Sequence, residues 1–344
     1  MKRINYLLAC ALMASCTSNS EDATLDEVVL TSLSNQVVVH SYRELAEAGF
    51  KLDQMAQATQ TPEEEAIVQL KSAWVEARKH WEQTEAFLFG PVDFNEIDPA
   101  LDSWPLDQTA VAEFLTSTDE INQEVLIRNP EVRGFHLIEF LLWGVDGKKN
   151  ASQFTEREWA FLKVATHDFA SNTQALLHAW TEGEDAFGTH IITPGKGSYE
   201  SPKEVYLEFA EGMAGIAAEM AESKIGAPLN KEGGSASPEE QESYFSDHSK
   251  SDLVNNLLSI RNIYNGRTDG QVGKGLGALV IAKNPSLDSE FQTKWNKAFE
   301  GVNQLPDSFT EAIQLHRDQV IRVQSDVRAL QVFLESDFIS FFNK

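Results

Sequence analysis

Residues 61–90 read TPEEEAIVQLKSAWVEARKHWEQTEAFLFG, a stretch that contains both a helix start and a helix stop. Thr61 can cap a first turn, Pro62 suits the first helical position, and the three glutamates that follow favour the positive end of the helix dipole. Apolar residues then recur every three or four positions up to Gly90 and Pro91, which end the pattern. The stretch therefore predicts one long amphipathic helix.

Helical periodicity continues on both sides of this stretch. Residues 27–58 carry an apolar stripe at helical spacing, and patterns typical of strands are scarce. Further helices are expected at about 107–117, 130–143, 155–181, 203–223, 247–263, 286–302 and 308–338. The sequence thus predicts an all-α protein.

The stretches 183–204 and 226–243 are rich in Gly, Pro and Ser, which marks connections. The first divides the helices into two groups, each large enough for a bundle of about four helices. A chain of 344 residues with 42% hydrophobic residues can supply two such cores. We expect two side-by-side helical-bundle domains, at residues 29–195 and 196–344.

The N-terminus has the pattern of an export signal. Basic residues precede a short apolar run from Leu7 to Met13, and small residues lead to Cys16. The stretch LMASC resembles a bacterial lipobox, in which the cysteine becomes the lipidated first residue; an ordinary cleaved signal is the alternative. We expect a signal peptide at residues 1–15, lipidation of Cys16 and a tether at 16–28, which together would anchor the protein at the bacterial cell envelope, on the outer membrane, facing the periplasm or the surface.

Charge and cysteine content limit the partners. The formal net charge is -25, which argues against nucleic acid and against anionic lipid, so membrane contact is expected through the lipid anchor only. The two cysteines, Cys10 and Cys16, both lie in the N-terminal segment, so no disulfide is expected in the mature domain. Cations are the natural partners of such an acidic chain.

Residues 134–144 read GFHLIEFLLWG, a mostly apolar stretch that carries an imidazole and a carboxylate. His136 and Glu139 are three residues apart, so on a helix they share one face, one turn apart. Gly134 weakens a helix and is expected where the backbone makes a close approach. The spacing also fits a core histidine that bonds its own helix neighbour, and both interpretations stay open at this point.

A second pair of the same spacing, Glu82 and Glu85, lies next to Trp81 on the predicted helix. Buried carboxylates are costly unless they are neutralised, so these must be solvated, paired with Arg78, or bound to a cation. More carboxylates follow in DFNEIDPALDSWPLD, at residues 93–107. Carboxylates combined with an imidazole suit iron, manganese or zinc.

Several of these segments resemble the imelysin family, in the order expected for it. In chain order they are WEQTEAFLFGP, LDSWPLD, the motif Gly-x-His-x-x-Glu at residues 134–139 and ESYFSDHSKSDLVNNLLSIRNIYNG, and the similarity runs from about residue 30 to the end. The resemblance implies a two-domain, all-helical envelope protein, often lipidated and associated with iron regulation.

Related periplasmic proteins of ferrous-iron uptake carry a proposed metal site. Carried onto this sequence, its ligands are Glu82, Glu85, Asp102 and His136, with iron favoured and zinc as a second candidate. LDSWPLD lacks the charged residues that usually follow in the iron-uptake branch, so Asp102 departs most from that pattern.

The resemblance also implies a cleft around the motif. Ser243 and Ser246 would form a wall that faces Gly134 and His136, and Trp81 is assigned to the same cleft. Serines near a helix start also serve as caps, so capping remains an alternative for them. The expected function is binding of a metal ion, or of a small metal-loaded ligand, in iron uptake or homeostasis, with envelope transport proteins as candidate partners.

Peptidase activity is the second functional hypothesis, because the family is classed with the peptidases. In that case His136 would be a metal ligand and Glu139 the general base. The sequence contains no His-Glu-x-x-His and no Gly-x-Ser-x-Gly motif, which favours the binding role.

Overall fold

The structure is a computed structural model, and it describes residues 23–183, 185–230 and 233–344. Every regular element in these ranges is helical, which confirms the predicted all-α fold for the described part of the chain. The expected signal peptide, Cys16 and the start of the expected tether lie outside these ranges. None of the described helices is both long and apolar enough to span a membrane.

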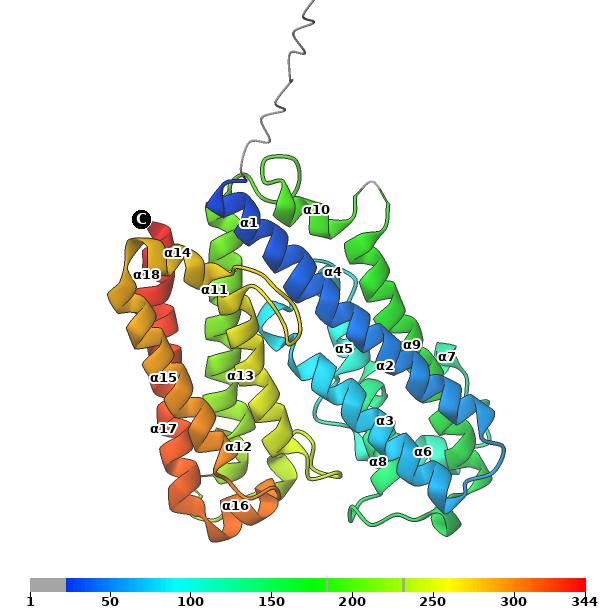
Figure 1. The fold of residues 1–344 in the computed structure, drawn as a ribbon. Helices are drawn as coiled ribbons and strands as arrows, with labels where there is room; N and C mark the ends of the chain where they lie inside the picture. The colour runs from blue at the N-terminus through cyan, green and yellow to red at the C-terminus, as the bar shows by residue number, and fades with distance from the viewer. Residues whose placement is uncertain (1–22, 184, 231–232) are drawn as a thin grey trace, which may run out of the picture.

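The first group of helices packs along a long N-terminal helix (Figure 1). That helix consists of α1 (Leu25–Ser32), a π-helical turn (Leu33–Val38) and α2 (Val39–Ala58). The other long members are α3 (Glu64–Glu82), α8 (Gly134–Trp143) and α9 (Glu156–Thr181). Both α2 and α8 contact α3 and α9, so the four helices enclose a shared core.

Short elements connect α3 to α8. In chain order they are a 3₁₀ turn (Glu85–Phe87), α4 (Pro91–Phe94), α5 (Ile97–Leu101), α6 (Gln108–Thr116), α7 (Gln123–Arg128) and a second 3₁₀ turn (Pro130–Val132). α5 packs on α8 and α9, and Asp102 directly follows it. This connection therefore brings a carboxylate beside the motif helix α8.

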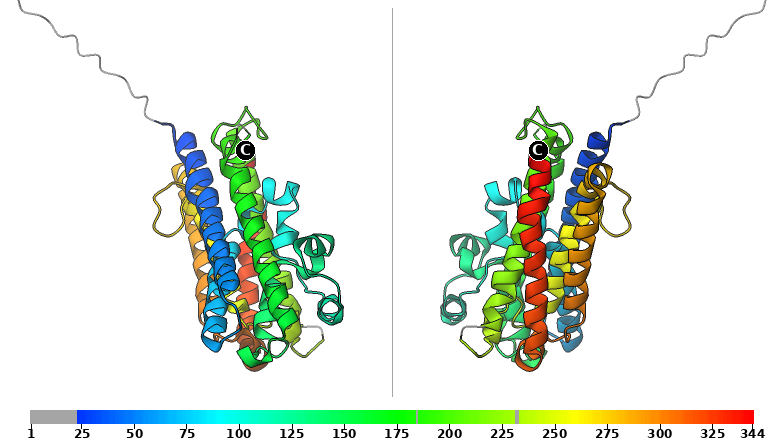
Figure 2. Two further views of the ribbon diagram at one scale, coloured as in Figure 1. Left: turned by 90° about the vertical axis from the view of Figure 1, so that its right-hand side faces the viewer. Right: turned by 90° about the vertical axis from the view of Figure 1, so that its left-hand side faces the viewer.

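The second group contains the C-terminal helices. Its long members are α11 (Pro202–Glu219), α13 (Ser249–Asn265), α15 (Pro285–Asn303) and α17 (Arg317–Phe333). Its shorter elements are a π-helical turn (Met220–Lys224), α12 (Gly226–Leu229), a 3₁₀ turn (Pro238–Glu240), α14 (Leu276–Lys283), α16 (Phe309–Leu315), a π-helical turn (Leu334–Phe338) and α18 (Ile339–Asn343). Two further short elements, a 3₁₀ turn (Ala151–Gln153) before α9 and α10 (Phe187–Ile192), belong to the first group, where α10 contacts α1 and α9. Figure 2 views the molecule from two sides, with α2 and α9 nearest the viewer in one and α17 in the other.

The two groups meet along α3. α13 packs on α3, and α11 packs on the 3₁₀ turn that follows it. Gly212 on α11 permits the second contact, because a Cβ there would lie 2.2 Å from the carbonyl oxygen of Ala86. The buried apolar side chains of both groups form one connected cluster. The division into domains at 29–195 and 196–344 remains a prediction.

Several helix ends differ from the expected ones. α1 begins at Leu25, where Thr24 and Glu27 form a capping box, so residues 25–28 of the expected tether are helical. α3 begins at Glu64, after Glu63 rather than Thr61 at the N-cap. The predicted helix at 308–338 is interrupted at His316, between α16 and α17.

α3 also ends earlier than predicted, at Glu82. Both the backbone N–H and the hydroxyl of Thr84 donate to the carbonyl oxygen of Trp81, each over 2.7 Å. These bonds close a tight turn, and the chain continues as the 3₁₀ turn that contains Glu85. Glu82 and Glu85 therefore do not lie on one regular helix.

The expected helix at 130–143 is broken at Arg133. Arg133 has an extended backbone and donates to the carboxylate of Asp168 from two nitrogens, each over 2.9 Å. α8 then begins at Gly134, whose φ is +69°; a Cβ there would lie 2.0 Å from the carbonyl oxygen of Leu101. The close approach expected at Gly134 is confirmed, and it places the start of α8 directly against α5.

Candidate functional site

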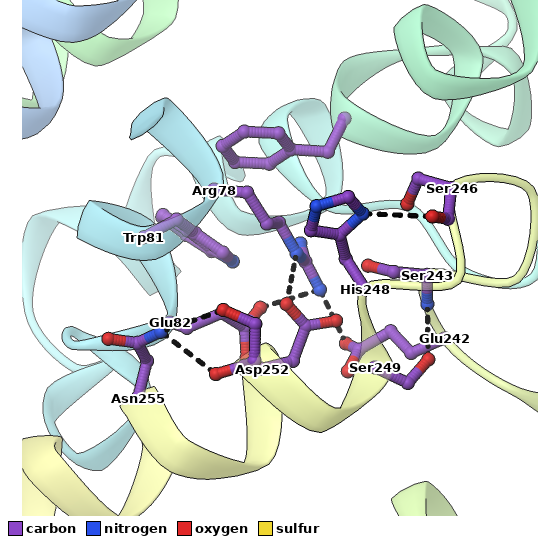
Figure 3. Close-up of polar contacts among 12 residues, drawn as sticks. Arg78, Trp81, Glu82, Glu242, Ser243, Ser246, His248, Ser249, Asp252 and Asn255 are labelled. Carbon is purple, nitrogen blue, oxygen red and sulfur yellow. Dashed lines mark hydrogen bonds and ion pairs between the residues drawn. The ribbon is translucent and has the colours of Figure 1, made fainter. Parts of the chain in front are cut away.

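Arg78, on α3, is the centre of a buried cluster of charged groups (Figure 3). Its side chain is 2% exposed. Its Nη2 lies 2.5 Å from Glu82 Oε1 and 2.9 Å from Glu242 Oε1, and its Nη1 lies 2.5 Å from Asp102 Oδ1. Nε lies 3.6 Å from Asp252 Oδ1 on α13. One guanidinium therefore contacts carboxylates from both groups of helices.

Lys224 is the second buried cation of this cluster, at the end of the π-helical turn after α11. Its Nζ lies 2.8 Å from Glu242 Oε2, 3.3 Å from Glu82 Oε2 and 4.0 Å from Glu85 Oε2. Glu82 and Glu242 are thus shared between Lys224 and Arg78. Most carboxylates of the cluster therefore lie next to a positive side chain. Of the alternatives that the sequence left open for Glu82, the structure shows pairing with Arg78.

Asp102 connects this cluster to the motif helix. Its Oδ2 accepts a hydrogen bond from Trp81 Nε1 over 2.6 Å, and its Oδ1 lies 3.1 Å from His136 Nε2. The other ring nitrogen of His136, Nδ1, lies 3.0 Å from Glu139 Oε2. His136 is therefore held between two carboxylates, one from the preceding connection and one from its own helix.

Glu139 is bound from the second group of helices. Its Oε1 accepts hydrogen bonds from the backbone N–H of Ser246 over 2.8 Å and from the Ser246 hydroxyl over 2.6 Å. Ser243 lies deeper, where its N–H donates to Ser249 Oγ over 3.1 Å (Figure 3). Ser246 thus contacts the motif directly, whereas Ser243 supports the loop before α13.

The four expected metal ligands lie in one region. Glu82, Glu85 and Asp102 each offer an oxygen, and these oxygens lie within 4.8 Å of one another. His136 joins them through Asp102. Asp102, His136 and Glu242 form a second group of the same tightness.

Sequence reasoning missed Glu242 and Lys224, which join Asp252 and Asn256 in this cluster. Asn256 Nδ2 donates to Glu82 Oε2 over 2.6 Å. Asp252 and Asn256 lie in the same family-like segment as Ser243 and Ser246, for which a cleft wall and helix capping are the two alternatives. Glu242 is the first residue of the family-like segment at 242–266, which is a signal, but Lys224 had none beyond its place at a helix end.

Burial and charge set the protonation states. Burial raises the pKa of Glu82 to about 8, although Arg78 and Lys224 oppose this shift. Burial likewise raises the pKa of Glu85 well above its usual range. Burial disfavours the charged form of His136, but its contacts with Asp102 and Glu139 raise its pKa to about 9. Burial also opposes ionisation of Asp102, yet Arg78 and His136 hold its pKa well below the usual range.

The residues present fit a cation. His136 Nε2, Glu82 Oε1 and Glu242 Oε2 are buried and make no well-oriented hydrogen bond among the described residues, despite the ion pairs around them. Imidazole nitrogen and carboxylate oxygen are ligands that iron and zinc accept. A small cavity of about 40 Å³ reaches the cluster, and His136 and Glu242 line it, whereas Glu82 and Glu85 do not.

Residues 38–334 match the model of the imelysin family. Iron-regulated protein A of Synechococcus elongatus is 27% identical over 345 residues, which cover 97% of this chain and 92% of that protein. Two crystal structures share the fold: an iron-regulated protein A precursor from Parabacteroides distasonis (TM-score 0.80, 24% identity) and an imelysin-like protein from Psychrobacter arcticum (TM-score 0.73, 14% identity). Each comparison covers 92% of this chain and 95% of the other. Because the family match extends over most of the sequence, from α2 to the end of α17, the chain belongs to the imelysin family.

Proposed function

We propose that this protein binds a metal ion, with iron favoured and zinc as the second candidate, at the buried cluster of Glu82, Glu85, Asp102 and His136. The observation that carries the proposal is the convergence of these side chains from three separate segments, with three carboxylate oxygens within 4.8 Å of one another. The role would lie in iron uptake or homeostasis. In a variant of this hypothesis, the site binds a small metal-loaded ligand rather than a free ion.

The names of two relatives support an iron-related role. The similar proteins from Synechococcus elongatus and Parabacteroides distasonis are both described as iron-regulated protein A. This chain carries, in addition, a hard oxygen and nitrogen donor set of the kind that iron accepts.

The built-in cations suggest how the cluster tolerates the absence of an ion. Arg78 and Lys224 neutralise carboxylates that would otherwise repel one another, so the donors stay together. An ion that arrives through the cavity would first meet His136 and Glu242, which line it, and the proton on His136 would have to leave before the ion binds. A bound ion would supply concentrated positive charge to Asp102 and Glu242.

Thermal stabilisation by metal tests this proposal. Chelator-treated protein should melt at a higher temperature when Fe or Zn is added, because the ion binds only the folded state. His136→Ala and Glu85→Gln should lose most of that gain. Glu124→Gln should keep it, since Glu124 is an exposed carboxylate paired with Arg128. Equal stabilisation of all four proteins would contradict the proposed ligands.

The proposed location is the cell envelope, with the chain anchored through a lipid on Cys16. In the producing cell, Cys16→Ala should move the protein from the membrane to the soluble envelope fraction, because an acidic chain without a lipid offers no other membrane affinity. Unchanged membrane partition would contradict the lipid anchor.

A metal-dependent peptidase is the second candidate, and one observation favours it. Ser246, which donates two bonds to Glu139, lines an open cavity of about 470 Å³, large enough for a peptide segment. Against it, both oxygens of Glu139 are engaged, by Ser246 and His136, which leaves no free base. Metal-loaded protein should therefore not cleave unfolded polypeptides. Chelator-sensitive cleavage that Glu139→Gln abolishes in a folded variant would reverse this ranking.

A further inference from the structure

A cavity of about 420 Å³ lies outside the Arg78 cluster, between α2, α3 and the glycine-rich connection from α13 to α14. Its walls include His40 and Glu44 from α2 and Glu76 and His80 from α3. Nothing in the proposed function uses these four side chains.

The four side chains form two pairs on helices that pack against each other. In each pair the members are four residues apart, so they share a helix face. His80 Nε2 lies 3.1 Å from Glu76 Oε1, and His40 Nε2 lies 3.9 Å from Glu44 Oε1. Glu44 of α2 lines the same cavity as Glu76 and His80 of α3, so carboxylates of both helices border the space beside this ring. A neutral imidazole is the form that binds metals.

Two unsatisfied hydroxyl groups give a second and independent indication of a ligand. Ser41 and Thr268 line the same cavity and are only 5% and 7% exposed. Neither hydroxyl oxygen has a hydrogen-bond partner among the described residues. Both oxygens are shielded from solvent in this conformation, and buried polar groups are ordinarily satisfied, so rotation of either side chain toward a polar occupant, such as the hydration shell of an ion, would supply the missing partner.

The connection that carries Thr268 is held in place rather than loose. The Thr268 N–H donates to the carbonyl oxygen of Gln36 over 3.4 Å, and the Lys274 N–H donates to Ser32 Oγ over 3.1 Å. The wall of the cavity opposite α3 is thus fixed to the N-terminal helix.

We propose that this cavity is a second metal site, which takes a hydrated divalent transition-metal ion with His80, Glu76 and Glu44 as ligands and His40 at its edge. Mixed imidazole and carboxylate ligands from facing helices are a common way for helical proteins to hold such ions. Glu76 already lies 3.1 Å from His80, and Glu44 is 40% exposed, so its side chain can rotate toward this pair.

The charge of the cavity suits a cation. Three carboxylates, Glu44, Glu76 and Asp269, stand against one positive side chain, Lys79. Lys79 Nζ lies 3.2 Å from Glu76 Oε1, in a half-exposed pair that an ion would displace into solvent.

Titration of the full mature protein with Zn²⁺, followed through the histidine side-chain NMR signals, tests this site. The signals of His80 and His40 should change together, and His80→Ala and Glu76→Gln should each weaken Zn²⁺ binding at this site at least about tenfold. His178→Ala is the matched control, because His178 also pairs with a glutamate four residues on, Glu182, over 3.3 Å, but on α9 and outside the cavity.

One variant at each metal site distinguishes the responses of the two sites. His136→Ala should leave the Zn²⁺ response of His80 unchanged, and His80→Ala should leave the response of His136 unchanged. A wild-type Zn²⁺ affinity in His80→Ala, or an equal loss in His178→Ala, would overturn the second site whatever happens at the first.

Discussion

Helix α3 carries two pairs of charged residues at the same spacing, and the two pairs behave differently. Arg78 and Glu82 are buried where the two groups of helices meet, whereas Glu76 and His80 line an open cavity on another face. Burial raises the pKa of Glu82 to about 8. At Glu76, burial raises the pKa, but Lys79 and His80 together outweigh that effect and lower it. The spacing is identical, so depth of burial, rather than sequence pattern, decides the protonation state.

The buried cluster also needs internal charge balance, which the open cavity does not. Carboxylates inside the protein depend on Arg78 and Lys224, because water cannot screen them. Carboxylates at the cavity edge are screened by solvent, so no buried cation is required there. Substitutions of equal size should therefore have very unequal effects in the two places.

The largest expected effect is that of Arg78→Met. It removes the guanidinium from four carboxylates and should cost about 3–5 kcal/mol of the free energy of unfolding. Lys79→Ala, one residue along, removes a half-exposed partner of Glu76 and should change it by no more than about 0.5 kcal/mol. Urea unfolding of both variants measures the contrast. Similar values for the two would show that burial is not the deciding difference.

The second expected effect is a dependence of stability on pH with opposite signs at the two places. In the metal-free protein, the pKa of His136 is raised to about 9 from about 6.5, so its contribution is complete below pH 6.5 and is lost as pH rises through 9. The loss should be about 3 kcal/mol. Burial lowers the pKa of His80, so His80 has the opposite effect on stability. The free energy of unfolding should fall as pH drops through this lowered pKa.

Unfolding measured between pH 5 and 10 checks both slopes. His136→Gln should flatten the decline above pH 6.5, while His80→Gln should leave that decline in place. A decline that survives His136→Gln unchanged would assign the pH dependence to other groups.

The smallest expected effect concerns the link between Ser246 and Glu139. Ser246→Ala removes a hydroxyl hydrogen bond to a buried carboxylate and should cost about 1.5 kcal/mol. Ser198→Ala removes an exposed bond to His190 and should cost less than about 0.5 kcal/mol. Thermal melting of both variants tests the difference, which would vanish if the Ser246 loop were loosely packed.

Local signals predicted the long helices well. α9 was expected at 155–181 and runs over Glu156–Thr181, because a capping box of Thr155 and Glu158 adds to its apolar periodicity. The break at Arg133 could not be predicted in the same way, since it depends on a partner, Asp168, that lies on another helix.

The residues of the candidate site also differ in whether local sequence could predict them. The pair His136 and Glu139 follows from spacing alone, because both lie on one helix. Asp102 entered only through family resemblance. Glu242 and Lys224 reach the cluster by packing of the second group of helices on α3, a long-range arrangement that no local pattern encodes.

Trp81 gives the molecule an optical reporter. Its indole N–H is bonded to the carboxylate of Asp102, and the ring itself is fully buried. Fluorescence emission of an indole responds to charge at its ring nitrogen, so neutralising Asp102 with an ion should shift the emission of Trp81. The difference spectrum between wild type and Trp81→Phe would isolate that signal from the six other tryptophans of the chain. Occupancy of the buried cluster could then be followed in real time, without any attached dye.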